Sequence, residues 1–206
     1  IALPADDCYQ LQNAMLQDCA KTAQDQTLSN RFSILDVLEQ NTFNASINEF
    51  RAAVNNQDGL SRSAAYLPYL NANVIPANVI GLSNFVESAR RTLAALIESQ
   101  THSKNAELHN IIGAISPNSK IRYRDSDIDK VLKASSSLYR FLLSAIKEAI
   151  NIVPPSGAMA GAIVSVDAHQ GVWKAPANIA LGSVVSPTIE ISQSQQETLN
   201  SDVSGK

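Results

Sequence analysis

The sequence contains few of the residues from which reactive or membrane-embedded sites are built. Its 206 residues include two cysteines, three histidines and one tryptophan, and charged residues make up only 17%. The apolar stretch at 152–166 cannot span a bilayer, because two prolines and two glycines interrupt it. A net charge of -3 predicts neither a nucleic-acid binder nor an acidic tail. The 45% of hydrophobic residues instead predicts an ordinary globular protein with a real core.

The two cysteines, Cys8 and Cys19, are predicted to be free thiols. If one helix covers both, about three turns separate them, or roughly 16 Å. A disulfide needs Cα atoms within about 7 Å, so these two cannot pair within that helix. Free thiols favour assembly in a reducing cytoplasm.

The first third of the chain alternates between strand-like and helical patterns. Residues 1–3 are predicted to end a strand, and a helix capped by Asp6 or Asp7 follows, with an apolar face of Leu11, Ala14, Met15 and Cys19. Strands are expected at 31–37 and 64–70, and between them a helix at 44–54 with Ile47, Phe50 and Val54 on one face. Pro68 places the second strand at an edge or a bulge. This rhythm predicts an α/β fold, with a mostly parallel sheet flanked by helices.

The middle of the chain is predicted to be a helical insertion. Apolar residues at helical spacing indicate amphipathic helices over 82–97 and 128–146, with a weaker helix near 107–115. Asp127 is the expected N-cap of the 128–146 helix. The predicted organisation is therefore a first part of the core at 1–73, a helical insertion or subdomain at 74–150, and the remainder of the core at 151–206.

Prolines open the last segment. Pro154 and Pro155 must stop the preceding helix, and Ser156 can then cap a short helix rich in alanine and glycine. Gly157 and Gly161 lie one turn apart and would let another backbone approach closely. A strand is predicted at 188–191 and the start of a helix at 192–199.

Candidate metal sites fail on spacing. Asp125, Asp127 and Asp129 resemble half of a calcium loop, but Lys130 and Ser136 occupy the positions that need glycine and glutamate. Acidic residues at a helix start explain them better. The histidines, His102, His109 and His169, are scattered and match no zinc motif. No metal ligand and no cofactor is predicted.

Candidate catalytic and nucleic-acid sites are equally weak. Ser156 does not stand in a nucleophile elbow, and Asp167 with His169 offers no oxyanion loop. The alternating stretch 120–124 carries three cations, but one such patch in an acidic protein indicates an exposed hairpin or linker more than a nucleic-acid contact. We therefore assign no catalytic residue and expect no enzyme.

The most specific motif surrounds the sole tryptophan, Trp173. It reads Gly-Val-Trp-Lys-Ala-Pro-Ala-Asn over 171–178 and includes Lys174, Pro176 and Asn178. Two readings of Trp173 stay open. It is either a core anchor held by a proline-stiffened loop or a contact between subunits, where buried tryptophans often dominate binding.

This motif and its surroundings resemble the contractile tail sheath family of phages and phage-tail-like injection systems. The similarity extends in order along the chain through the segments 31–37, 64–70, 154–161, Asp167, 171–178 and 195–200. Two departures stand out: the stretch 74–150 is longer and more helical than a minimal sheath, and the sequence stops before the family's C-terminal arm.

The resemblance implies a structural subunit that polymerises helically around an inner tube and contracts to drive it through a target envelope. Its implied partners are other copies of itself, the inner tube protein, and baseplate and terminator proteins, with no nucleic acid and no membrane insertion. Assembly is expected in the bacterial cytoplasm, within a phage virion or a phage-tail-like particle. Trp173, Lys174, Pro176 and Asn178 are the candidate assembly or core-motif residues.

Two alternatives remain. A baseplate or adaptor protein could share the core and bind as a single ring. An α/β enzyme would place its site at the carboxyl ends of its strands. It would need converging polar groups near 4–7, 36–39 and 70–73, where acids are available in the first two segments but no nucleophile is paired with a base.

Overall fold

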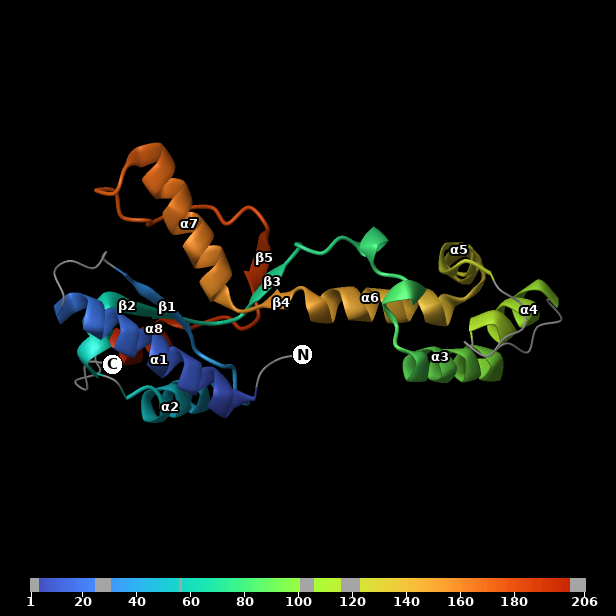
Figure 1. Ribbon diagram of the computed structural model, residues 1–206, viewed down its shortest axis with the longest axis horizontal. Coiled ribbons are helices and arrows are strands. Elements are labelled where there is room, and N and C mark those ends of the chain that lie inside the picture. Colours follow the sequence, from blue (N-terminus) through green and yellow to red (C-terminus); the bar gives the residue numbers. More distant parts are fainter. Residues whose placement is uncertain (1–3, 25–30, 56, 101–105, 116–122, 201–206) are drawn as a thin grey trace. The chain divides into compact units, whose positions relative to one another are not determined.

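The computed structural model describes residues 4–24, 31–55, 57–100, 106–115 and 123–200. The chain folds into two compact units (Figure 1). The terminal unit combines 1–72 with 152–206, and the inserted unit is 73–151. The predicted division into a first part of the core (1–73), a helical insertion (74–150) and the remainder of the core (151–206) stays a prediction.

The terminal unit contains four α-helices and both sheets found in the described residues. Its elements before the inserted unit are α1 (Ala5–Gln24), β1 (Ser33–Asp36), α2 (Phe43–Ala53), the 3-10 helix η1 (Gln57–Arg62), β2 (Ser63–Tyr66) and β3 (Leu70–Ala72). Those after it are β4 (Ile152–Val153), α7 (Pro155–Gln170), β5 (Val184–Pro187) and α8 (Gln193–Asn200).

The parallel pair of β1 and β2 gives the terminal unit its two faces. Successive side chains of a strand point to opposite faces. On one face of β1, Leu35 is buried and the Ser33 hydroxyl lies 3.0 Å from the Cys19 thiol of α1. On the other face, the Asp36 carboxylate contacts Ser156 of α7. Figure 1 accordingly draws α1 and α2 on one side of the strand pair and α7 on the other.

The core of the terminal unit lies among α1, β1 and α2. It consists of Tyr9, Leu16, Leu35, Val37, Phe43, Ile47, Phe50 and Val54. The apolar face predicted for the 44–54 helix is confirmed, and Thr42 caps α2 by accepting a hydrogen bond from the Ala45 amide. The face predicted for α1 is wrong except at Cys19, because Leu11, Ala14 and Met15 are exposed. Cys8 and Cys19 are free, as predicted.

The predicted fold class is wrong. The described residues form mostly helices and two small sheets, one of two parallel strands and one of three antiparallel strands in the order β4-β3-β5, not a mostly parallel sheet flanked by helices. Pro68 supplies the reason. Proline has no N–H for a ladder, so the predicted 64–70 strand divides into β2 and β3, which join different sheets. The amide of Tyr69 donates to Glu39 Oε1 instead, at 2.7 Å.

Two other predicted strands also differ. The strand expected at 188–191 lies four residues earlier, as β5, and pairs antiparallel with β3. The strand expected at 1–3 lies outside the described residues. The predicted strand at 31–37 is confirmed as β1, and the predicted helix at 192–199 is confirmed as α8.

In its described residues, the regular elements of the inserted unit are all helices. It contains η2 (Ala77–Val79), η3 (Leu82–Asn84), α3 (Glu87–Gln100), α4 (Ala106–Ile115), α5 (Asp125–Ser135) and α6 (Ser137–Ile150). Its core is a separate cluster of Leu82, Leu93, Ile97, Ile111, Ile112, Ile115, Ile128, Leu132 and Tyr139.

Two helix predictions in this unit need correction. The helix expected over 82–97 begins only at Glu87, after the short η3 turn. The helix expected over 128–146 is two helices, because buried Ser136 ends α5 and caps α6 by accepting from the Tyr139 amide at 3.1 Å. The predicted N-cap is also wrong: Arg124 is the N-cap of α5, and Asp127 lies in its first turn.

Buried and half-buried polar side chains tie the inserted unit together. Asp129 accepts hydrogen bonds from the Leu82 amide, at 2.9 Å, and from the Tyr139 hydroxyl. Burial and this hydrogen bond raise the pKa of Tyr139. At the end of the unit, the side-chain amide of Asn151 contacts residues at its start. The Asn151 oxygen Oδ1 accepts from the Val74 backbone amide, and Nδ2 donates to the Ile75 carbonyl. These groups hold irregular backbone that lacks helical partners.

Candidate assembly surface

Helix α7 begins at the double proline. Pro154 is its N-cap and Pro155 occupies the first turn, where a missing N–H costs nothing. Ser156 is therefore not the cap that the sequence predicted. Its amide and hydroxyl both donate to the Asp36 carboxylate, at 2.8 Å and 2.6 Å. The helix is also not short, since it continues for 16 residues to Gln170.

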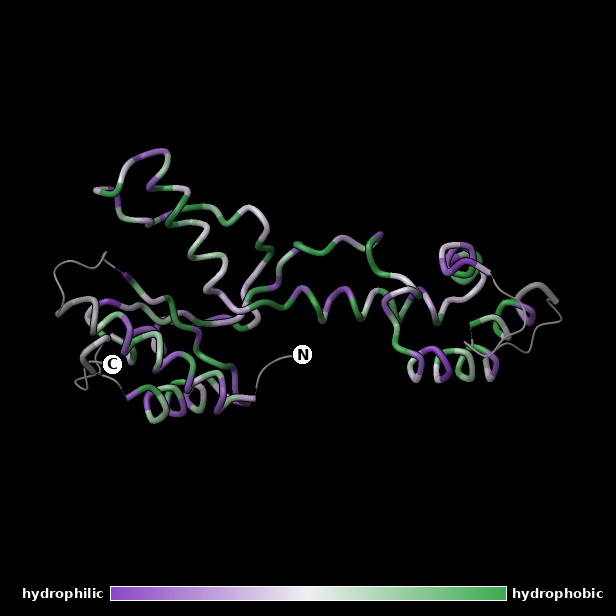
Figure 2. The backbone as a smooth tube through the Cα atoms, in the orientation of Figure 1, coloured by the Kyte–Doolittle hydropathy of each residue, from purple (hydrophilic) through white to green (hydrophobic). Residues whose placement is uncertain are grey.

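Most of α7 is apolar but little of it is buried. Figure 2 shows hydrophobic or neutral colours along most of the helix, and its first charged residue is Asp167. Only Pro155, Ala162 and Val166 are buried. A helix that is apolar on all sides is normally covered by protein. In the described residues, the chain covers α7 only in part: Met159 and Ile163 are half-buried, and Val164 is 66% exposed.

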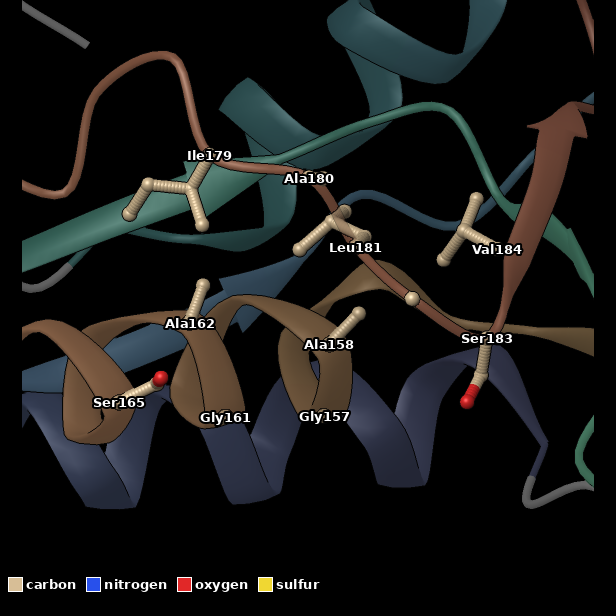
Figure 3. A pocket seen from close by; sticks show the side chains of 11 residues that line it. Gly157, Ala158, Gly161, Ala162, Ser165, Ile179, Ala180, Leu181, Ser183 and Val184 are labelled. Carbon is tan, nitrogen blue, oxygen red and sulfur yellow. The ribbon is translucent and has the colours of Figure 1, made fainter.

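A groove runs between α7 and the chain segment that returns along it. Gly157, Ala158, Gly161, Ala162 and Ser165 form one wall, and residues 179–184 form the other. In Figure 3 the side chains of Ile179 and Leu181 extend toward those of Ala162 and Ala158. The hollow measures about 300 Å³. A Cβ added to Gly157 or Gly161 would meet nothing within 4 Å, so neither glycine is required by packing inside this chain.

The loop 171–178 carries the sole tryptophan into solvent. Gly171 ends α7 with φ 88°, a conformation that glycine adopts without strain. The Trp173 ring folds over Gly171, close to the position that a Cβ would occupy, yet 85% of Trp173 is exposed. This exposure argues against the first interpretation, in which Trp173 is a core anchor within its own chain. Lys174, Pro176 and Asn178 are exposed as well.

Large apolar side chains gather on this part of the terminal unit. Along α7, the loop and the segment that returns from it, five are exposed: Val164, Val172, Trp173, Val185 and Ile189. We call α7, the loop 171–178 and the segment 179–189 the α7 surface. Five large exposed apolar side chains between residues 164 and 189 make this surface a candidate for contact with another protein.

The acids proposed for an enzyme site have structural partners instead. Asp36 accepts from Ser156, and Glu39 Oε1 accepts from the Tyr69 amide and the Thr188 hydroxyl. Burial, with the nearby Asp36 charge, raises the pKa of Tyr69. Asn71 donates to Ser186 and Pro187 of β5. These polar groups therefore join α7 and β5 to the ends of β1 and β3.

The other candidates do not converge on a site. In the part of the chain that the structure describes, no three His, Cys, Asp or Glu side chains are placed to hold a metal ion. Asp125 forms a two-pronged ion pair with Arg90, and Asp129 binds Leu82 and Tyr139. His109 and His169 are exposed, and His102 lies outside the described residues. Of the cationic stretch 120–124, only Tyr123 and Arg124 are described.

Comparison with known proteins adds no relative. No protein-family model matches the chain, and no curated protein matches it. Among the described helices, none is both long enough and apolar enough to cross a membrane. The α7 surface is thus the candidate functional feature of this chain. The sequence predicts its tryptophan loop but not its groove.

Proposed function

We propose that the protein is a structural subunit that assembles with further copies of itself through the α7 surface, as the sheath of a contractile tail. The observation that carries this proposal is the partly covered apolar helix α7, with the groove beside it and its exposed tryptophan loop. Such a surface favours a protein partner over a small substrate.

The same surface supports helical assembly over a closed dimer. It offers a projecting apolar loop, with Val172 and Trp173, and an apolar hollow at a different place on the same unit. When a projection of one copy fits a hollow of the next, the contact is head-to-tail, and it generates rings or open helical arrays. The resemblance of the 154–161 and 171–178 motifs to tail sheaths points to the same kind of array, wound around an inner tube.

In this account, contraction is a change in how rigid subunits are arranged. The extended lattice is kinetically trapped and the contracted one buries more surface, so rotation and outward movement of each subunit release energy without any chemical step. The carboxylates of Asp36 and Glu39 then have structural roles, in keeping with their partners in the terminal unit.

The groove provides the test. Gly161 lines the hollow, and a Cβ added there would meet no atom of its own chain within 4 Å, so we expect leucine at this position to obstruct the hollow without disturbing the backbone of α7. We expect Gly161→Leu to abolish or strongly reduce assembly of the complete gene product while leaving the subunit folded. Gly113→Leu is the matched control, because Gly113 is an exposed glycine of α4 that also has open space around it.

Sedimentation and negative-stain electron microscopy give the readout. Tubes from the wild type and from Gly113→Leu, but not from Gly161→Leu, would support the proposal. Equal assembly by all three proteins would show that the groove is not part of the contact between subunits. A single ring that never extends would instead favour a baseplate or adaptor protein.

A further inference from the structure

We infer that Asp36 and Glu39 are positioning residues for the assembly surface: they fix α7 and the returning segment 179–189 in the pose that a neighbouring copy recognises. This inference rests on the proposed function. It identifies two side chains that lie outside the α7 surface but hold that surface in position. Both lie at or just after the end of β1, within four residues of each other.

Asp36 holds the first turn of α7. Its two carboxylate oxygens each accept one hydrogen bond from Ser156, from the amide to Oδ1 at 2.8 Å and from the hydroxyl to Oδ2 at 2.6 Å. The first amides of a helix have no partner within the helix, and a carboxylate there also meets the positive end of the helix dipole. Asp36 therefore fixes both the position and the direction of the α7 N-terminus, across 120 residues of sequence.

Glu39 holds the far end of the returning segment 179–189, whose first residues form the other wall of the groove. Its Oε1 accepts from the Tyr69 amide, at 2.7 Å, and from the hydroxyl of Thr188, the residue directly after β5. The Thr188 amide also donates to the Tyr69 carbonyl at 2.9 Å. The end of the returning segment is thereby tied to the same stretch of chain that ties the start of α7.

These ties matter because the surface contributes little to the core. Within the described residues, none of the side chains of the terminal unit's core cluster, including those packed around it, comes from 154–189. The hydrogen bonds along the loop are local, such as Lys174 to Gly171 and Val184 to Leu181. Loss of the carboxylates should therefore loosen the α7 surface and leave the core of α1, β1 and α2 folded.

Hydrogen exchange on the unassembled subunit tests the positioning directly. We expect Asp36→Ala with Glu39→Ala to speed exchange in peptides covering 155–170 and 184–189 by on the order of tenfold, since bonds to charged groups are the stronger ones. Exchange in α2 should not change. Asp36→Asn keeps one acceptor oxygen and should restore part of the protection. Asp127→Asn, an exposed carboxylate of α5, is the control.

Assembly of the same proteins supplies the second readout. The inference predicts that the double variant needs a several-fold higher concentration to form tubes, with Asp36→Asn between it and the wild type. If the double variant exchanges faster but assembles like the wild type, the inference is wrong. It is also wrong if hydrogen exchange does not change in the double variant, whatever its assembly. If the wild type itself never assembles, the proposed function fails and this inference fails with it. Tubes from the wild type and the double variant alike would overturn the inference alone.

Discussion

At the scale of single residues, the buried Tyr9 is expected to make the stability of the terminal unit depend on pH. Tyr9 of α1 is 3% exposed, and its ring packs edge-on against Phe50, with 6.1 Å between the two ring centroids. Burial raises the pKa of Tyr9 to about 12, from an ordinary value of 10.0. Because the folded state holds this proton more tightly than the unfolded state, its contribution to stability is complete below pH 10 and is lost as pH rises toward 12.

Replacing Tyr9 isolates this effect. Tyr9→Phe should keep the ring in the core and remove its titration, so stability should fall less between pH 9 and pH 11 than in the wild type, by about 1 kcal/mol. Urea unfolding followed by circular dichroism at the two pH values measures the difference. Tyr123→Phe, at a tyrosine that is 48% exposed, should keep the wild-type dependence. Parallel pH curves for all three proteins would contradict the assignment.

Gly171 is the residue on which the tryptophan loop depends. Its φ of 88° is unfavourable for other residues, and an added Cβ would lie 2.3 Å from the Trp173 ring. Gly171→Ala should cost roughly 1–2 kcal/mol locally and displace the ring. Since Trp173 is the sole tryptophan, fluorescence anisotropy reports it without labelling and should fall. Gly182→Ala, which has open space around it, should leave the anisotropy unchanged.

At the scale of elements, Ser136 decides that α5 and α6 are two helices. It is buried, ends α5, and caps α6 through the Tyr139 amide. Loss of such a cap costs about 1 kcal/mol. Ser136→Ala should therefore destabilise the inserted unit by that amount in urea unfolding. Ser135→Ala, at the exposed last residue of α5, should have little effect. Equal stability of the two variants would show that the break is not held by the cap.

The elements that the sequence predicted well are those with a local cause. The apolar period of α2 and the short apolar run of β1 needed no distant partner. The break at Ser136 was missed because apolar spacing continues through it, although three consecutive serines were a usable signal. Pro68 was read as an edge or a bulge, but its larger consequence is that β3 leaves the parallel pair for another sheet.

The candidate surface was only partly predictable for the same reason. Glycine, tryptophan and proline close together indicated a specified loop, and Trp173 is exposed. The bond between Asp36 and Ser156 joins residues 120 positions apart, and the one between Glu39 and Thr188 joins residues 149 apart. Neither pairing leaves a local signal, so the carboxylates were assigned to a possible enzyme site.

At the scale of the whole molecule, the chain separates a compact helical insertion from the unit that carries the α7 surface. Residues 73–151 have their own core, and the chain leaves and re-enters the terminal unit through β3 and β4, which pair antiparallel at Leu70 with Val153 and at Asn71 with Ile152. Assembly through the terminal unit would therefore not require the insertion to supply contacts.

Negative-stain electron microscopy of the purified complete gene product, over a range of concentrations, tests the central claim most directly. The account predicts long hollow cylinders with a helical lattice from the wild type, and their loss in Gly161→Leu. A monodisperse monomer at every concentration, or cylinders that persist unchanged when the groove is filled, would contradict it.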